Sequence, residues 1–228
     1  MVAKRTQQLF DTLVGKATLK QKVYRNTLTT LNMLKKGMVQ LTTKYEEVET
    51  DLSKEIPFTF KDRSEFEAEL KFAGDTLVFM MHTNVFEFPR DHTVMKTPYI
   101  SEDIERSYCG VINIFNFLSD SFKYQRMNDA GYLIGRLFVN KDMHYFVEGK
   151  RELGFLYSNF GTSEVNAENI ADILESAIYY TINFDLLVPP YDNIKEVMVQ
   201  DFITALDSMQ MKTGKRMGFR FQADINGK

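Results

Sequence analysis

The sequence predicts an α+β protein, in which a long N-terminal coiled-coil helix precedes an antiparallel β-meander sheet packed with two C-terminal helices. Three observations predict this class. A seven-residue apolar repeat fills the first fifty residues, two-residue alternation follows Pro57, and helical spacing returns near residue 170. We expect two domains: a coiled-coil oligomerisation helix over 1–56 and an α+β globular domain over 57–228.

The first element is a helix predicted over residues 8–53, about 65–70 Å long at about 1.5 Å per residue. Eleven of thirteen positions at alternating three- and four-residue steps are apolar. A repeat held over this length is typical of a helix that pairs with another helix, and we expect a second copy as the partner. Leu34→Lys should then abolish the oligomer. The predicted association residues are Leu31, Leu34, Met38, Leu41, Tyr45 and Val48.

Two features of this helix leave alternatives open. Glycine costs a helix interior about 1 kcal/mol relative to alanine, so a helical hairpin folding near Gly37 is the competing geometry. Apolar residues also flank the early repeat at Leu9, Val14, Val23 and Leu28, where a two-stranded coiled coil usually carries charges. This wider surface indicates that the first half of the helix packs in a larger helical cluster or against a globular domain.

The sheet begins after Pro57, because the residue before a proline is pushed out of the helical region. Alternation over 66–72, a turn at Gly74-Asp75 and a strand-like run over 76–88 predict a hairpin, although 63–72 would equally form a short helix. Turn residues occupy 140–142 and 148–150, and the polar connection 120–131 is expected on the surface. The predicted meander strands are 111–117, 132–139, 143–147 and 153–157.

The C-terminal part returns to helical spacing. Apolar residues over 170–181 share one helix face, and a second amphipathic pattern spans 194–209 after the break at Pro189-Pro190. Alternation over 217–221 predicts a final edge strand.

Charge is divided unevenly along the chain, although the formal net charge is only −3. Residues 1–44 contain nine Lys or Arg and one acid, whereas residues 57–228 contain eighteen basic and twenty-five acidic groups. A basic arm joined to an acidic body either binds an anionic polymer or is attracted to the body of a neighbouring copy. The candidate anion or partner surface comprises Arg136, Lys150, Arg151, Lys16, Lys22, Arg25, Lys35 and Lys36.

The cysteine count and the lengths of the apolar runs predict the cellular compartment. One cysteine excludes an intramolecular disulfide framework, which is typical of a reducing compartment, so we expect a cytoplasmic protein. No apolar segment follows Met1, and the longest apolar run, Leu77 to Met81, is far too short for a membrane span.

No chemical motif is found among the residues that usually carry catalysis or metal binding. His82, His92 and His144 lack the spacing of a metal site, and Cys109 begins an apolar run that is typical of a buried cysteine. Phe160 to Ser163 precedes a helix, but acidic residues at its start favour capping over phosphate binding. We therefore expect no catalytic residue, no metal and no cofactor.

These observations predict a homo-oligomeric cytoplasmic interaction or regulatory protein of the scaffold type. The coiled coil would set the stoichiometry, and the α+β domain would present a recognition surface to an unidentified protein partner. One alternative is a nucleic-acid-associated protein that uses the basic N-terminal helix. Another is a small-molecule sensor or enzyme with a site in the sheet domain, supported by the polar 120–131 connection and the basic hairpin.

Overall fold

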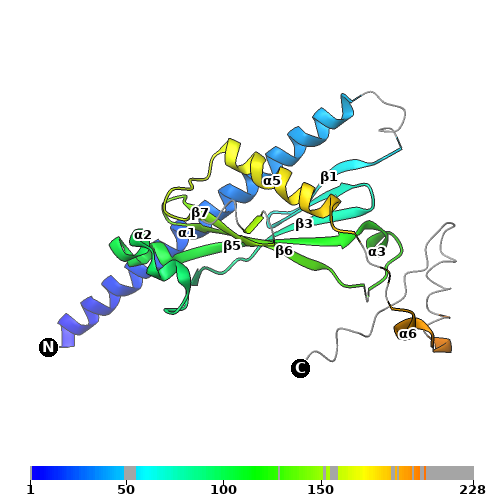
Figure 1. Ribbon diagram of the computed structural model, residues 1–228. Coiled ribbons are helices and arrows are strands. Elements are labelled where there is room, and N and C mark those ends of the chain that lie inside the picture. Colours follow the sequence, from blue (N-terminus) through cyan, green and yellow to red (C-terminus); the bar gives the residue numbers. More distant parts are fainter. Residues whose placement is uncertain are drawn as a thin grey trace.

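A long helix lies across an antiparallel sheet, and a second helix lies beside it (Figure 1). The sheet has seven strands in the order β1-β2-β3-β5-β6-β7, with β4 paired to β5. The predicted α+β class, with a long helix followed by an antiparallel sheet, is confirmed. The computed structural model describes residues 2–48, 55–127, 129–150, 153–154, 159–185, 188, 190–196, 198–200 and 203.

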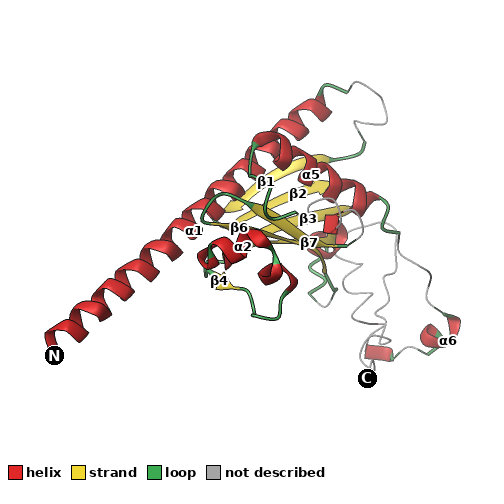
Figure 2. Cartoon of the chain, turned by 60° about the vertical axis from the view of Figure 1, so that its left-hand side comes forward, coloured by secondary structure: helices red, strands yellow, loops and turns green. Residues whose placement is uncertain are grey.

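Helix α1, Val2–Glu46, runs without interruption through Gly37, so the hairpin alternative is wrong. It begins earlier than the predicted helix and ends before the predicted residue 53. Figure 2 shows its N-terminal turns projecting beyond the rest of the molecule, while its second half lies along the sheet.

All strand pairs are antiparallel. The predicted hairpin is confirmed: Phe72 lies opposite Asp75, and Ala73 in the turn has a positive φ of 46°. The short-helix alternative for 63–72 is therefore wrong. The strands are β1 Phe58–Ser64, β2 Glu67–Phe72, β3 Asp75–Met81, β4 Phe86–Glu87, β5 Tyr108–Leu118, β6 Tyr132–Asn140 and β7 Tyr145–Gly149.

The structure differs from the predicted sheet at three places. Strand β1 was not predicted, although its alternation of Phe58 and Phe60 with polar residues is a strand signal. The predicted run 76–88 is broken, because β3 ends at Met81 and the chain leaves the sheet before β4. Leu153 and Gly154 are helical, and the rest of the predicted strand 153–157 lies outside the described residues.

The main core lies between one face of the sheet and helices α1 and α5, Ala167–Ile182. Its fully buried side chains include Leu31, Leu34 and Met38 of α1, Phe79 of β3 and Leu174 of α5. Two glycines allow the elements to approach closely: a Cβ at Gly110 of β5 would lie 2.0 Å from Thr27 Oγ1, and one at Gly37 would lie 2.7 Å from Leu174 Cδ1.

The opposite face of the sheet is covered at one end by three short helical turns. They are η1 Thr93–Lys96, α2 Pro98–Glu102 and η2 Ile104–Ser107. They bury a second cluster that includes Ile100, Cys109 and Phe138.

The remaining helices are α3, Ser119–Lys123, and α6, Tyr191–Ile194. Helix α3 lies in the connection that was predicted to be on the surface. The predicted helix 194–209 falls mostly outside the described residues, and the predicted edge strand 217–221 falls entirely outside them. Among the residues that the structure describes, no helix is both long and apolar enough to cross a membrane.

Candidate functional site

The predicted association residues are covered mainly by the chain itself. Leu31, Leu34 and Met38 are fully buried against the sheet and α5, and Leu41 packs against the same core. Because Leu34 belongs to this core, Leu34→Lys would disrupt the fold as well as any oligomer. Tyr45 makes an edge contact with the Phe58 ring at 5.2 Å between centroids.

Val48, the last of these residues, is half exposed. The burial of the central positions is accounted for within one chain, so association through these six residues stays a prediction. The coiled coil and the domain boundary at residue 56 also stay predictions.

The apolar residues of the repeat, with the apolar residues that flank them, form a ridge along α1. The first part of this ridge is not covered by the sheet or by α5. We call residues 4–20 of α1 the N-terminal arm, about 25 Å of helix at about 1.5 Å per residue. Within the arm, Leu9, Phe10, Leu13 and Val14 are 63%, 52%, 62% and 63% exposed. The ridge therefore divides into a half that the sheet and α5 bury and a half that faces solvent.

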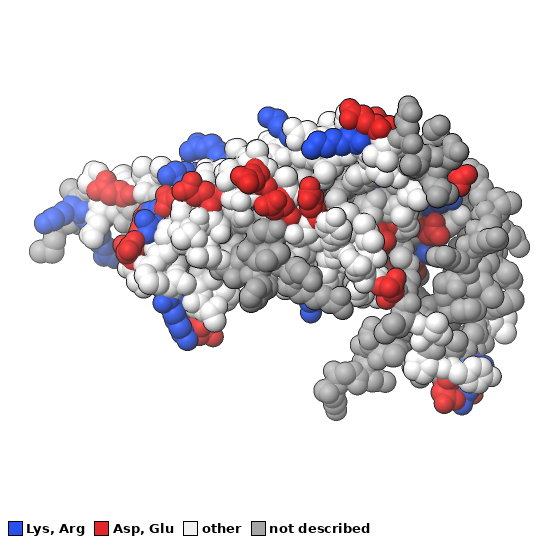
Figure 3. Space-filling model, turned by 45° about the horizontal axis from the view of Figure 1, so that its top comes forward, with Lys and Arg blue, Asp and Glu red and all other residues white. Residues whose placement is uncertain are grey.

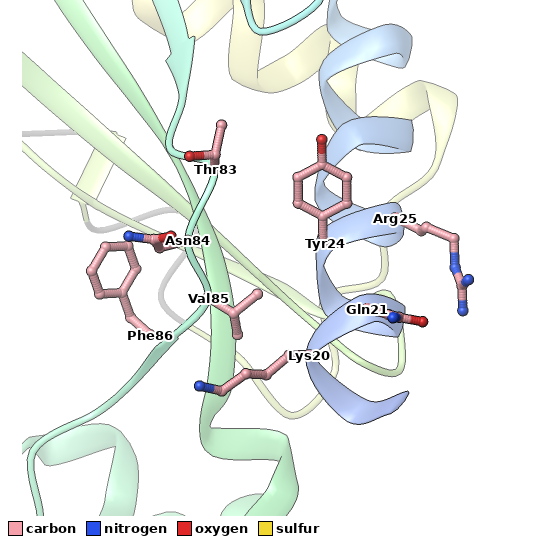
Figure 4. Close-up of a pocket in the computed structure, with 8 residues that line it drawn as sticks. All are labelled: Lys20, Gln21, Tyr24, Arg25, Thr83, Asn84, Val85 and Phe86. Carbon is pink, nitrogen blue, oxygen red and sulfur yellow. The ribbon is translucent and has the colours of Figure 1, made fainter. Parts of the chain in front are cut away.

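A groove lies where these two halves meet, between α1 and the segment that joins β3 to β4. Its volume is about 700 Å³, and Figure 4 shows how its walls are built. The Lys20 side chain extends towards Val85, and Val85 points towards α1, whereas Arg25 points away from the opposing segment. The groove is lined by Lys20, Gln21, Tyr24, Arg25, Thr83, Asn84, Val85 and Phe86.

The predicted basic residues on α1 do not form one surface. Lys35 Nζ lies 2.6 Å from Asp62 Oδ1 and donates to the Ser64 carbonyl, while Lys22 Nζ lies 3.9 Å from Asp142 Oδ1. Lys16 Nζ lies over the Tyr108 ring, 6.0 Å from its centroid. Arg25 lines the groove, and Lys36 is exposed.

The basic residues predicted on the sheet lie apart from those on α1. Arg136 alternates with Leu137, which is buried under α1, so Arg136 faces the other side of the sheet, where it pairs with Glu148. Lys150 follows β7 and is exposed, and Arg151 lies outside the described residues. Figure 3 shows basic and acidic side chains intermixed on the face that it displays.

A polar cluster connects the segment of short helical turns, from η1 through α2 to η2, with the loop between β6 and β7. The Arg106 guanidinium stacks on the Tyr99 ring at 4.3 Å, donates to the Tyr99 carbonyl and pairs with Asp142 at 3.2 Å. Buried Asn140 donates to the Tyr99 hydroxyl at 2.9 Å, and its Oδ1 accepts from the backbone N–H groups of Asp142 and His144. These groups satisfy one another, which is typical of a structural network.

Lys141 adds an ion-pair network at the edge of this cluster. Its ammonium lies 2.7 Å from Asp103 and 2.6 Å from Glu105. The hydrogen bond from Lys141 lowers the pKa of the Asp103 carboxyl. Burial opposes the charge on Lys141, but the two carboxylates outweigh it and raise the pKa of that ammonium. This pairing keeps the Asp103 carboxylate and the Lys141 ammonium charged near neutral pH.

The residues considered for catalysis or metal binding are packed among aromatic or apolar side chains. Cys109 is buried, and burial raises the pKa of its thiol well above the usual range, which disfavours the thiolate that a nucleophile needs. His144 stacks on Tyr99, and His82 contacts Phe86. Within the described part of the chain, no group of three or more His, Cys, Asp or Glu side chains is placed to hold a metal ion.

The groove wall at 83–86 was missed by sequence reasoning, because these residues were assigned to a continuous strand. A signal for the break exists: the polar run His82-Thr83-Asn84 interrupts the apolar residues on either side. Asn84 then donates its backbone N–H to His82 Nδ1 at 3.0 Å, a local turn that bends the chain away from the sheet.

Comparison with known proteins adds no assignment to this geometry, since no family model, curated protein or solved structure matches the chain.

Proposed function

We propose that the protein is a homo-oligomeric interaction protein of the scaffold or regulatory type, and that its N-terminal arm is the association surface. The observation that carries the proposal is the exposed apolar ridge formed by Leu9, Phe10, Leu13 and Val14. A contiguous apolar face on a projecting helix is the usual mark of an interaction site. Full burial of one such side chain contributes about 1.5–3 kcal/mol.

A second copy is the proposed partner, because the ridge continues a seven-residue repeat. Such a repeat makes a helix complementary to another helix with the same spacing. Association would bury the arm and not the second half of α1, since Leu31, Leu34 and Met38 are already packed against the sheet and α5. The α+β body is then free to present a surface to another protein.

Two rival functions have weaker support. Nucleic-acid binding requires unpaired cations on one surface, but Lys22 and Lys35 lie beside carboxylates and Arg136 is on another face. Small-molecule binding in the groove would leave the arm exposed. We further propose a cytoplasmic location, supported by the single unpaired cysteine.

The test compares two lysine substitutions on the arm. Leu13→Lys places a charge on the ridge, and Gln8→Lys places the same charge on an exposed position away from the ridge. Leu, Gln and Lys have similar helix propensities, so helix propensity and net charge are matched. Light scattering after size exclusion should give an oligomer for the native chain and for Gln8→Lys, but a single-chain mass for Leu13→Lys. Equal masses for all three proteins would contradict the proposal.

A further inference from the structure

The groove and the ridge of the arm face the same way along α1. Phe10, Ala17 and Tyr24 are separated by seven residues, which is close to two helical turns, so they form one line along the helix. Leu13 and Lys20 form the neighbouring line by the same spacing. The exposed ridge therefore leads directly into the groove, where Lys20 and Tyr24 form one wall.

We infer that the arms of two copies pair antiparallel, and that the groove of each copy receives the apolar part of the other copy's arm. This inference rests on the proposed self-association and specifies its geometry. The two lines of the ridge face each other in an antiparallel pair, so Leu13 of one copy lies opposite Tyr24 of the other, and Ala17 lies opposite Lys20. A two-fold axis repeats both of these residue pairs and closes the dimer.

The charge on Lys20 favours the antiparallel arrangement. In a parallel pair every seam residue lies opposite its own counterpart, which would place Lys20 against Lys20. Two facing ammonium groups repel each other. In the antiparallel pair Lys20 faces the small side chain of Ala17, which leaves room for the lysine stem to lie along the helix with its ammonium in water.

The groove itself also favours this arrangement. Val85 faces α1 from the segment that joins β3 to β4, and Tyr24 stands across from that segment (Figure 4). An antiparallel partner brings its Leu13 beside Tyr24, in the groove. A parallel partner would place its Leu13 beside Leu13 of the first copy, which lies seven residues before Lys20, the first groove residue on α1.

Disulfide trapping tests the inference. Leu13→Cys and Tyr24→Cys proteins are prepared separately, mixed and oxidised. A disulfide needs Cα atoms about 4.4–6.8 Å apart, whereas the two Leu13 positions of an antiparallel pair are eleven residues, or about 16 Å, apart along the axis. We expect a cross-linked dimer from the mixture and none from Leu13→Cys alone. Native Cys109 is buried and does not compete.

A second measurement guards against a folding defect in Tyr24→Cys, because Tyr24 packs on Phe66 with a centroid distance of 6.4 Å. Val85→Lys changes only the groove wall, and Thr93→Lys, on an exposed turn elsewhere, is its control. We expect Val85→Lys to raise the dimer dissociation constant at least tenfold and Thr93→Lys to leave it unchanged.

The outcomes separate this inference from the proposed function. A dimeric protein whose Leu13→Cys variant cross-links to itself would be a parallel pair, which overturns the inference but keeps self-association. A Val85→Lys dimer as tight as the native one would also overturn the inference. A native chain that is monomeric at all concentrations would overturn both.

Discussion

Gly15 and Gly37 show how strongly the surroundings of one residue decide its role. Both lie inside α1, where glycine weakens a helix. A Cβ at Gly15 would meet no atom within 4 Å, whereas a Cβ at Gly37 would lie 2.7 Å from Leu174 Cδ1. Gly37 therefore allows α5 to approach α1, and the sequence pattern that indicated a bend at this position reflects packing instead.

This contrast gives a matched pair of substitutions. Gly15→Ala should raise the free energy of unfolding by up to about 1 kcal/mol, through helix propensity alone. Gly37→Ala gains the same propensity but overpacks a buried leucine, which typically costs about 1–3 kcal/mol, so we expect a net loss of about 1 kcal/mol. Urea unfolding measures both. Equal stabilisation by the two variants would show that α1 and α5 are not closely packed at Gly37.

Asp75, the first residue of β3, gives a pH-dependent prediction. Burial raises the pKa of its carboxyl, and a hydrogen bond from Asn116 only partly offsets this. The native state then holds the proton more tightly than the unfolded state, so Asp75 lowers stability as the pH rises through its raised pKa. Asp75→Asn should therefore be more stable than the native chain at pH 7.

The advantage of Asp75→Asn should disappear at pH 3, where the native carboxyl is protonated in both states. Urea unfolding at the two pH values measures this, with Asp91→Asn, at an exposed position, as the control. A stability difference that does not change with pH would contradict the proposed cause.

At the scale of elements, the strands predicted from alternation and turn residues are the part of the fold that local sequence determines. The hairpin of β2 and β3 and the meander of β5, β6 and β7 follow from alternation and turn residues, and the structure confirms them. The short turns η1, α2 and η2 had no detectable periodicity, because each has fewer than two helical turns. Their position depends on packing against Ile100 and Phe138 and on the Asn140 network, which involve residues distant in sequence.

The Asn140 network gives the prediction at this scale. Asn140→Ala removes the acceptor for two backbone N–H groups and the donor to the Tyr99 hydroxyl, leaving partners unpaired. We expect a loss of about 1–3 kcal/mol in the free energy of unfolding. Asn140→Asp, which keeps the acceptor, should lose less, and exposed Asn84→Ala should have almost no effect. A loss from Asn140→Ala no larger than that from Asn84→Ala would show that the network does not hold these turns.

At the scale of the molecule, α1 has two different surroundings along one continuous repeat. Residues around Leu31 and Leu34 enter the core of the chain, while Leu9 and Leu13 project into solvent. The seven-residue repeat could not distinguish these halves, because a helix presents the same stripe to a sheet, to α5 or to another copy. The polar run His82-Thr83-Asn84 signals where β3 leaves the sheet, but no local pattern predicts that the following segment lies opposite Lys20 and Tyr24 of α1, about sixty residues earlier in the chain.

The division of α1 makes one measurement decisive for the account, namely the mass of the unmodified chain by analytical ultracentrifugation over a range of micromolar concentrations. One chain has a mass of 26.5 kDa. We predict a concentration-dependent species of twice that mass, because burial of the exposed arm drives pairing. A sedimenting mass equal to one chain at every concentration would contradict the claim that the arm is an association surface.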